Sequence, residues 1–151
     1  MCGLIAAFTG SNALEPVIRL AMQRMHRRGP DGEGFWQEDS VYLGHRRLAI
    51  IDLDQRAAQP MHSACGRYVI VFNGEIYNFR ALRDELISQG VAFSTTSDTE
   101  VILALFAAEG EAMLPKLHGM FAFVIWDRLA RRAFAARDWP WSGRAGHQFR
   151  P

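Results

Sequence analysis

The sequence predicts an α+β protein in which mainly antiparallel sheets stack on one another and helices pack on their faces. Strand-like segments occur in groups with helices between them, unlike the regular strand–helix alternation of a parallel sheet. Each expected helix carries apolar residues that need a sheet or another helix to cover them. A chain of 151 residues is long enough for one such domain and too short for two comfortable ones.

The chain opens with a short apolar segment, residues 2–8, which is typical of a buried strand. Ser11 or Asn12 is expected to cap the helix that follows, and Pro16 is tolerated in its first turn. The glycines and the proline of residues 27–34 should end this helix. The apolar residues that recur at helical spacing are Leu14, Val17, Ile18, Ala21, Met22 and Met25.

Four strand-like segments occupy the middle of the chain. Three of them come in succession, at residues 34–37, 41–45 and 47–53, the last with a β-branched centre. After the loop 54–66, residues 67–73 (RYVIVFN) form the clearest strand of this region.

Two helices and a hairpin complete the predicted domain. Asn78 opens one helix, which Gly90 ends, and residues 97–100 (SDTE) form a capping box that starts the next. Residues 119–127 and 132–138 then read as a hairpin. The residues expected to be buried are Phe79, Leu82, Leu86 and Ile87 in the first helix, and Val101, Ile102, Leu105 and Phe106 in the second.

The composition changes abruptly after Asp138. Residues 139–151 (WPWSGRAGHQFRP) hold half of the 4 tryptophans and follow neither the helical nor the strand period. We therefore expect a domain over residues 1–138 and an aberrant tail over 139–151, as a frameshifted or truncated gene would produce. The other two frames of the coding DNA test this hypothesis: one of them should encode the expected continuation.

Composition and charge point to a cytoplasmic enzyme or binding module. The formal net charge of +1 gives no electrostatic reason to expect a nucleic acid or a membrane surface. The 2 cysteines make no disulfide framework and fit a reducing compartment. No apolar run approaches the roughly 20 residues of a membrane helix, and the apolar opening lacks the basic start of a signal peptide.

The position of Cys2 raises a chemical question. Once Met1 is removed, Cys2 carries both a thiol and a free α-amine, which together form a nucleophile and its base. The alternative is a small buried residue at the start of a core strand.

Two further stretches, in the first half of the chain, have open interpretations. Residues 26–32 (HRRGPDG) form a rigid turn that is either functional or simply a helix stop. Arg46 and Arg47 stand at the expected start of the strand 47–53. If that strand alternates, one of the two arginines should project inward, where it needs an anionic partner.

The last two stretches carry groups suited to binding charge. Asn73–Gly74 would ordinarily be a hairpin turn, yet a helix follows it. Such a turn can aim the Asn73 amide and the Gly74 N–H at an oxyanion, where losing one donor typically costs about 2.7–4 kcal/mol. Asp98, which the capping box leaves unexplained, could meet a substrate ammonium.

Other chemistries find little support in the sequence. The 5 histidines show no metal spacing, and His62 and Cys65 lack a second ligand pair. Cys65 is expected to be a loop or strand-edge residue. No nucleophile elbow, phosphate loop or dinucleotide fingerprint is present.

Six motifs in order carry a family resemblance: MCGLIA, HRRGPDGEG, LGHRRLAIIDL, FNGEIYNFRALRDEL, SDTEVILAL and LHGMFAFVIWD. They resemble the N-terminal glutaminase domain of glutamine-hydrolysing asparagine synthetases, which are class II glutamine amidotransferases with an N-terminal nucleophile. The resemblance runs from Met1 to Asp138. It implies the four-layer αββα sandwich of Ntn hydrolases, here incomplete at its C-terminal end.

The resemblance also implies roles for individual residues. Cys2 matches the nucleophile, Arg47 the group that grips the substrate carboxylate, and Asp98 the ligand of the substrate ammonium. The catalytic set is Cys2, Asn73 and Gly74, with the last two as oxyanion donors. The glutamine-binding set is Arg47, Leu48, Ala49, Ile50, Ile51, Asn73, Gly74, Glu75 and Asp98.

The implied reaction is the hydrolysis of L-glutamine to glutamate and ammonia through a thioester. A free α-amine, with an ordinary pKa of about 7.7–8.0, can accept the thiol proton at cytoplasmic pH. No cofactor is expected in this chain, because ATP and Mg belong to the synthetase domain that is missing here. That domain in trans, or a second copy of the chain, is the expected partner. The alternatives are a catalytically silent glutamine-binding or interaction module and a non-functional frameshifted remnant.

Overall fold

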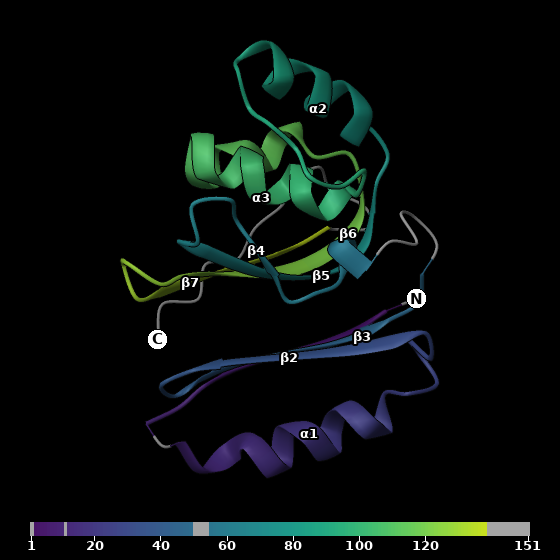
Figure 1. The fold of residues 1–151 in the computed structure, drawn as a ribbon, viewed down its shortest axis with the longest axis vertical. Helices are drawn as coiled ribbons and strands as arrows, with labels where there is room; N and C mark the ends of the chain where they lie inside the picture. The colour runs from purple at the N-terminus through teal and green to yellow at the C-terminus, as the bar shows by residue number, and fades with distance from the viewer. Residues whose placement is uncertain (1, 11, 50–54, 139–151) are drawn as a thin grey trace.

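Two sheets lie face to face between two helical layers in the computed structural model, which describes residues 2–10, 12–49 and 55–138 (Figure 1). Helix α1 (Glu15–Arg24) covers the outer face of a three-stranded sheet. Helix α3 (Asp98–Glu109) lies on the outer face of a four-stranded sheet, and α2 (Phe79–Ser88) packs against α3. This arrangement confirms the expected four-layer sandwich.

The three-stranded sheet runs in the order β1-β3-β2, with antiparallel neighbours throughout. Its strands are β1 (Gly3–Phe8), β2 (Gly32–Glu38) and β3 (Val41–Arg47). The pairing of Gly3 with Arg46 brings the N-terminus of the chain to the end of the central strand β3.

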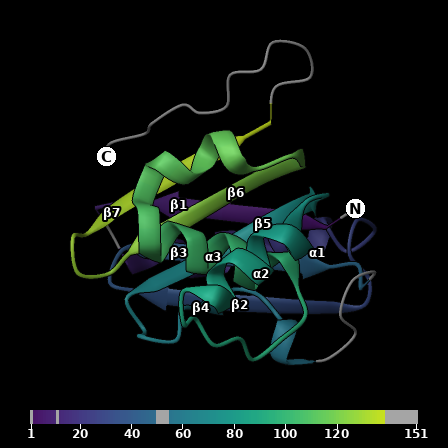
Figure 2. The same cartoon turned by 90° about the horizontal axis from the view of Figure 1, so that it is seen from above.

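The four-stranded sheet runs in the order β4-β5-β6-β7 and is also antiparallel. Its strands are β4 (Met61–His62), β5 (Tyr68–Ile76), β6 (Gly119–Asp127) and β7 (Arg132–Arg137). Seen from above, α3 lies over this sheet with α2 beside it (Figure 2). Short 3-10 segments at Asn12–Leu14, Gln55–Ala57 and Gly110–Lys116 complete the fold.

Strand alternation sets which core each residue of β5 enters. Val69 and Val71 pack between the two sheets, whereas Ile70 and Phe72 pack under α2 and α3. The same alternation directs Asn73 toward the three-stranded sheet, where the N-terminus lies.

The start of α1 differs from the predicted cap at Ser11 or Asn12. The helix begins at Glu15, after a 3-10 turn, and its N-cap Leu14 makes no side-chain capping bond. Pro16 sits at the beginning of the helix, where its missing N–H leaves one donor fewer to cap. Ser11 lies outside the described residues.

The predicted strand 47–53 is wrong where the structure describes it. Strand β3 ends at Arg47, so Arg46 and Arg47 stand at a strand end and not at a strand start. Instead of a strand partner, the Asp31 carboxylate accepts the N–H of Ala49 at 2.9 Å. The remainder, residues 50–53, lies outside the described part of the chain.

Strand β5 also runs further than predicted. The expected turn at Asn73–Gly74 is absent, because both residues pair with β6, as Asn73 with Ala122 and Gly74 with Phe121. The helix opened by Asn78 and the hairpin of β6 and β7 are as expected.

Two residues placed on buried helix faces are exposed. Val17 and Ile87 have exposed fractions of 58% and 50%, because α1 and α2 are each covered on one side only. Among the described residues, no helix is both long and apolar enough to cross a membrane.

Candidate active site

A pocket of about 220 Å³ opens where the ends of β3 and β5 meet the start of α3. Pockets that take drug-sized ligands usually exceed about 300 Å³, so this one suits a smaller molecule. Seven of the predicted site residues line it: Cys2, Arg47, Leu48, Asn73, Gly74, Glu75 and Asp98.

Cys2 lies immediately before β1 and is half-buried. Its Sγ accepts a hydrogen bond from the Leu48 N–H at 3.3 Å and lies 3.7 Å from the Leu48 carbonyl oxygen. Arg28 Nε donates to the Cys2 carbonyl at 3.1 Å. The thiol is therefore held against the segment that follows β3.

The loop after α1 organises this segment. The Gly29 carbonyl accepts a bond from Arg46 Nε at 3.1 Å, and the Asp31 N–H donates to the Arg47 carbonyl at 3.0 Å. A Cβ on Gly29 would lie 2.4 Å from the Arg46 backbone, so only glycine allows this approach. The motif HRRGPDG therefore does more than end a helix.

Arg46 and Arg47 point to opposite faces of β3. Arg46 is the buried one, and its guanidinium contacts the Glu33 carboxylate and His26 Nδ1. The expectation of an inward arginine with an anionic partner is thus met by Arg46. Arg47 is half-buried and lines the pocket that Cys2 also lines.

Gly74 adopts a backbone conformation that favours glycine, with φ at +151°. A Cβ at this position would lie 2.2 Å from the Met120 carbonyl oxygen on the neighbouring strand. Glycine therefore lets β5 continue beside β6 while Asn73 and Gly74 both line the pocket. The amide of one and the N–H of the other are donors of the type that stabilises an oxyanion.

Asp98 is the buried anion of the pocket, with an exposed fraction of 4%. Its Oδ2 accepts the Ile76 N–H at 3.1 Å. Burial raises the pKa of Asp98 because the charged form loses hydration, while the N–H groups of Ile76 and Thr99 act in the opposite direction. Among the described residues Asp98 has no cationic partner, so an ammonium group of a ligand would complete the site.

The cap of α3 fixes where Asp98 stands. Ser97 Oγ accepts the Glu100 N–H at 3.3 Å, as the capping box predicts. The Glu100 carboxylate, however, accepts from the N–H groups of Ser94 and Thr95, at 2.8 and 2.7 Å, and not from Ser97. The box therefore also anchors the loop that leads into the helix.

Residues 1–141 match the family described as "Glutamine amidotransferase domain". The chain belongs to this family. The family resemblance expected from the six motifs is confirmed.

Curated relatives of this amidotransferase domain are named as asparagine synthetases. The chain is 41% identical over 143 residues to glutamine-hydrolyzing asparagine synthetase 1 of Bacillus subtilis, covering 91% of this chain and 22% of the relative. It is 40% identical over 141 residues to glutamine-hydrolyzing asparagine synthetase 3 of Arabidopsis thaliana, covering 91% of this chain and 24% of the relative. The chain thus spans about a quarter of the length of these relatives.

A solved structure shares the fold of this amidotransferase domain. The glutamine phosphoribosylpyrophosphate amidotransferase of Bacillus subtilis, solved in complex with ADP and GMP, superposes with a TM-score of 0.73. The two chains are 22% identical over 91% of this chain and 37% of the other. At this identity the likeness establishes the sandwich fold alone.

Ala49, which is predicted to bind glutamine, does not line the pocket. The Ala49 N–H is directed to Asp31. Ile50 and Ile51 lie outside the described residues, so their role stays a prediction.

Three buried polar residues of this amidotransferase domain line the pocket but were not predicted as site residues: His45, Gln59 and Thr99. His45 could have been found, since it lies two residues before Arg47 on the same strand face. Gln59 gave no periodic signal, because it belongs to the irregular segment before β4.

His45 is almost fully buried, and its Nε2 lies 3.1 Å from the Phe72 carbonyl oxygen. Because that carbonyl can only accept, Nε2 carries the proton. Burial lowers the pKa of His45 to about 4, so the ring is neutral at neutral pH.

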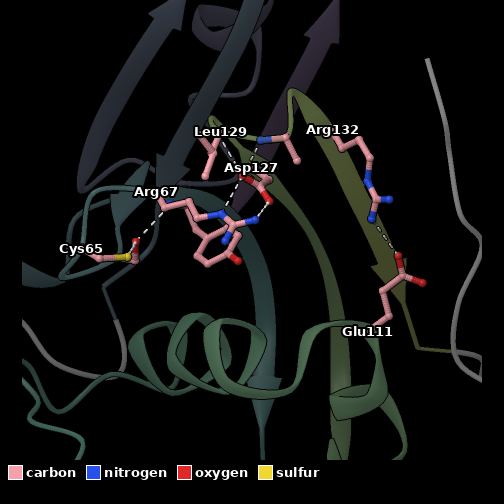
Figure 3. A network of polar contacts seen from close by, with 9 residues as sticks. Cys65, Arg67, Glu111, Asp127, Leu129 and Arg132 are labelled. Atoms are coloured by element: carbon pink, nitrogen blue, oxygen red, sulfur yellow. Dashed lines mark hydrogen bonds and ion pairs between the residues drawn. The ribbon is translucent and has the colours of Figure 1, made fainter.

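The sequence also raised metal ligation and the second cysteine, Cys65, as candidates for chemistry. No group of three His, Cys, Asp or Glu side chains in the described ranges could hold a metal ion. Cys65 is exposed in the loop before β5, as predicted, near Ser63 and Arg67 (Figure 3). None of these three residues lines the pocket.

Proposed function

We propose that this chain hydrolyses glutamine to glutamate and ammonia, as the glutaminase part of a glutamine-dependent asparagine synthetase. One observation carries the proposal: a single small pocket gathers the Cys2 thiol, Arg47, the Asn73–Gly74 pair and the buried carboxylate of Asp98. A nucleophile, oxyanion donors and two opposite charges match a zwitterionic amino acid that carries a side-chain amide.

Cys2 is the proposed nucleophile. After removal of Met1, the α-amine of Cys2 takes the thiol proton, directly or through a water. The thiolate attacks the carboxamide carbon, and the Asn73 amide and the Gly74 N–H stabilise the oxyanion that forms. Ammonia leaves with the transferred proton as the thioester forms, and water then hydrolyses the thioester to glutamate.

The charged ends of glutamine determine its orientation. Arg47 would pair with the α-carboxylate and Asp98 with the α-ammonium, both in a partly or fully dehydrated pocket. Glu75, at the pocket rim, would contact the ligand as its family counterpart is expected to do. The backbones of Leu48, Ile50 and Ile51 are further proposed contacts.

The wider role rests on the relatives. Their names, glutamine-hydrolyzing asparagine synthetases, support a role in making asparagine. We propose that the ammonia passes to an ATP-dependent synthetase domain. We propose that ATP and Mg belong to that domain and that this chain needs no cofactor of its own. The domain in trans, or a second copy of this chain, is the proposed partner, in the cytoplasm.

Intact-mass measurement with an electrophilic glutamine analogue tests the glutaminase proposal. Untagged protein should lack Met1 and gain a single adduct, which the Cys2→Ala variant should not form. Retention of Met1, or no adduct on a folded sample, would contradict the proposal and favour a silent glutamine-binding module or a remnant. Glutamine binding without an adduct would select the silent module.

A further inference from the structure

We propose that Gln59 is a positioning residue of the glutaminase site, which couples the oxyanion strand β5 to the helix that carries Asp98. The inference rests on the proposed function. Gln59 touches neither the nucleophile nor the predicted charge-binding groups through any described hydrogen bond, and it acts through the backbone of Phe72 and through Thr99.

The edge of β5 beside the oxyanion residues is only partly paired. Strand β4 pairs with β5 only at Met61 with Ile70 and His62 with Val69. Continuing this register would place Gln59 opposite Phe72, but β4 begins only at Met61. The backbone of Phe72 therefore faces this side without a strand partner, directly before Asn73.

Two side chains replace the missing strand. The Phe72 N–H donates to Gln59 Oε1 at 2.5 Å, and His45 Nε2 donates to the Phe72 carbonyl at 3.1 Å. Gln59 comes from the segment before β4, and His45 comes from the opposite sheet. Phe72 is thus held on both of its backbone polar groups immediately before the oxyanion residues.

The other end of the Gln59 amide reaches the ammonium side of the pocket. Gln59 Nε2 donates to Thr99 Oγ1 at 3.3 Å, and Thr99 follows Asp98 in the first turn of α3. Both side chains are buried, at 9% and 4% exposure. One neutral amide therefore bridges the strand that supplies the oxyanion donors and the helix that supplies the carboxylate.

The main chain of Gln59 lies close against strand β2. A Cβ on Gly34 of β2 would lie 1.9 Å from the Gln59 carbonyl oxygen, so the two backbones are in close contact. A side chain whose backbone packs against β2 and whose amide is bonded through both its oxygen and its nitrogen can preorganise the groups it connects. Because a misplacement of about 1 Å can cost roughly a hundredfold in rate, this geometry bears on catalysis.

Steady-state glutamine hydrolysis by Gln59→Leu and Thr99→Val tests the bridge. Gln59→Leu keeps a similar volume and removes both bonds, so kcat should fall about tenfold to a hundredfold and KM should rise. Thr99→Val removes only the bond from Gln59 Nε2 to the helix that carries Asp98, so KM should rise with a smaller loss of kcat. In the Thr99→Val background, Gln59→Leu should raise KM less than it does in the parent.

Two controls separate positioning from a general loss of structure. In a Cys65→Ser background, Cys2 is the one cysteine that iodoacetamide can alkylate, and that reaction requires neither the oxyanion donors nor glutamine binding. Its rate should be unchanged in Gln59→Leu. Leu86→Val, a buried core position on α2 that takes part in none of these polar bonds, should lower Tm without the fall in kcat and the rise in KM.

The outcomes distinguish the two proposals. If the parent chain neither binds nor hydrolyses glutamine, the proposed function fails and the Gln59 proposal fails with it. If the parent is active and Gln59→Leu leaves kcat and KM unchanged, only the Gln59 proposal is overturned. The Gln59 proposal would also be overturned if the loss of kcat in Gln59→Leu came with an equivalent fall in Tm and a changed rate of Cys2 alkylation. Such a result would indicate unfolding alone.

Discussion

The single residue Asp98 is a buried carboxylate that has no positive partner among the described residues, and a ligand could supply one. Its carboxylate is buried against the backbone of Ile76 at the start of α3. Burial raises its pKa, so the folded protein holds the charged form at a cost in stability. A ligand ammonium would relieve this cost on binding.

We expect Asp98→Asn to stabilise the empty protein and to weaken glutamine binding. Asparagine keeps an oxygen for the Ile76 N–H and removes the buried charge, which should raise the free energy of unfolding by about 0.5–2 kcal/mol. The affinity for glutamine, measured by calorimetry in a Cys2→Ala background, should fall roughly a hundredfold. Unaltered affinity would contradict the proposed ammonium contact.

Gly74 is the second residue whose identity the structure requires. Gly74→Ala should abolish glutamine hydrolysis, because an added Cβ meets the β6 backbone at Met120 and a φ of +151° is strained for alanine. Gly66→Ala is the matched control: its φ is +70°, but no atom lies within 4 Å of the added Cβ. Hydrolysis should survive there, as a rate assay would show, and equal losses in both variants would contradict the argument.

At the scale of the element, the β6–β7 turn depends on one carboxylate (Figure 3). Asp127 Oδ1 accepts the N–H groups of Leu129 and Ala130, both at 3.0 Å, while Arg67 donates to both carboxylate oxygens. The Arg67 guanidinium lowers the pKa of Asp127, because its hydrogen bonds favour the charged form. The carboxylate thus ties the start of β5 to the hairpin.

We expect Asp127→Ala to lower the free energy of unfolding by about 1–2 kcal/mol, since two turn N–H groups lose their acceptor. Asp127→Asn retains an oxygen for the turn and should lose much less, because the exposed Arg67 contributes little to stability. Urea denaturation of both variants measures the difference. An equally large loss in Asp127→Asn would place the stabilising effect in the ion pair and not in the turn.

The elements that the sequence predicted correctly are those with a clear period or a clear cap. Helix α3 has its Ser97 cap, and β6 and β7 form the expected hairpin, because local patterns determine both. Strand β5 was predicted to end at Asn73 because an Asn–Gly pair usually turns. Pairing with β6 over the whole length of β5 overrides that local preference.

Candidate site residues could be predicted when they belong to a family motif. They could not be predicted when their role depends on contacts with residues far away in the sequence. The family motifs located Cys2, Arg47 and Asp98, and the pocket brings them together. Gln59 belongs to an irregular segment whose partners, Phe72 and Thr99, lie 13 and 40 residues away. No local pattern carries that information.

At the scale of the whole molecule, His45 joins the two sheets, because it belongs to β3 and bonds to β5. Its pKa of about 4 in the folded protein lies below the ordinary 6.5. Between pH 6.5 and pH 4, His45 is therefore protonated in the unfolded chain and neutral in the folded chain. The stability that His45 contributes is complete above pH 6.5 and is lost on the way to pH 4.

Urea denaturation as a function of pH tests this coupling between the sheets. From pH 6.5 down to 4, the free energy of unfolding should fall by at most about 3 kcal/mol through His45. The raised pKa of Asp98 acts in the opposite direction, since its protonation stabilises the folded state. His45→Gln, whose amide can still donate to Phe72, should flatten the profile over this window. A variant whose pH profile keeps the slope of the parent would show that the inter-sheet histidine is not the group that titrates.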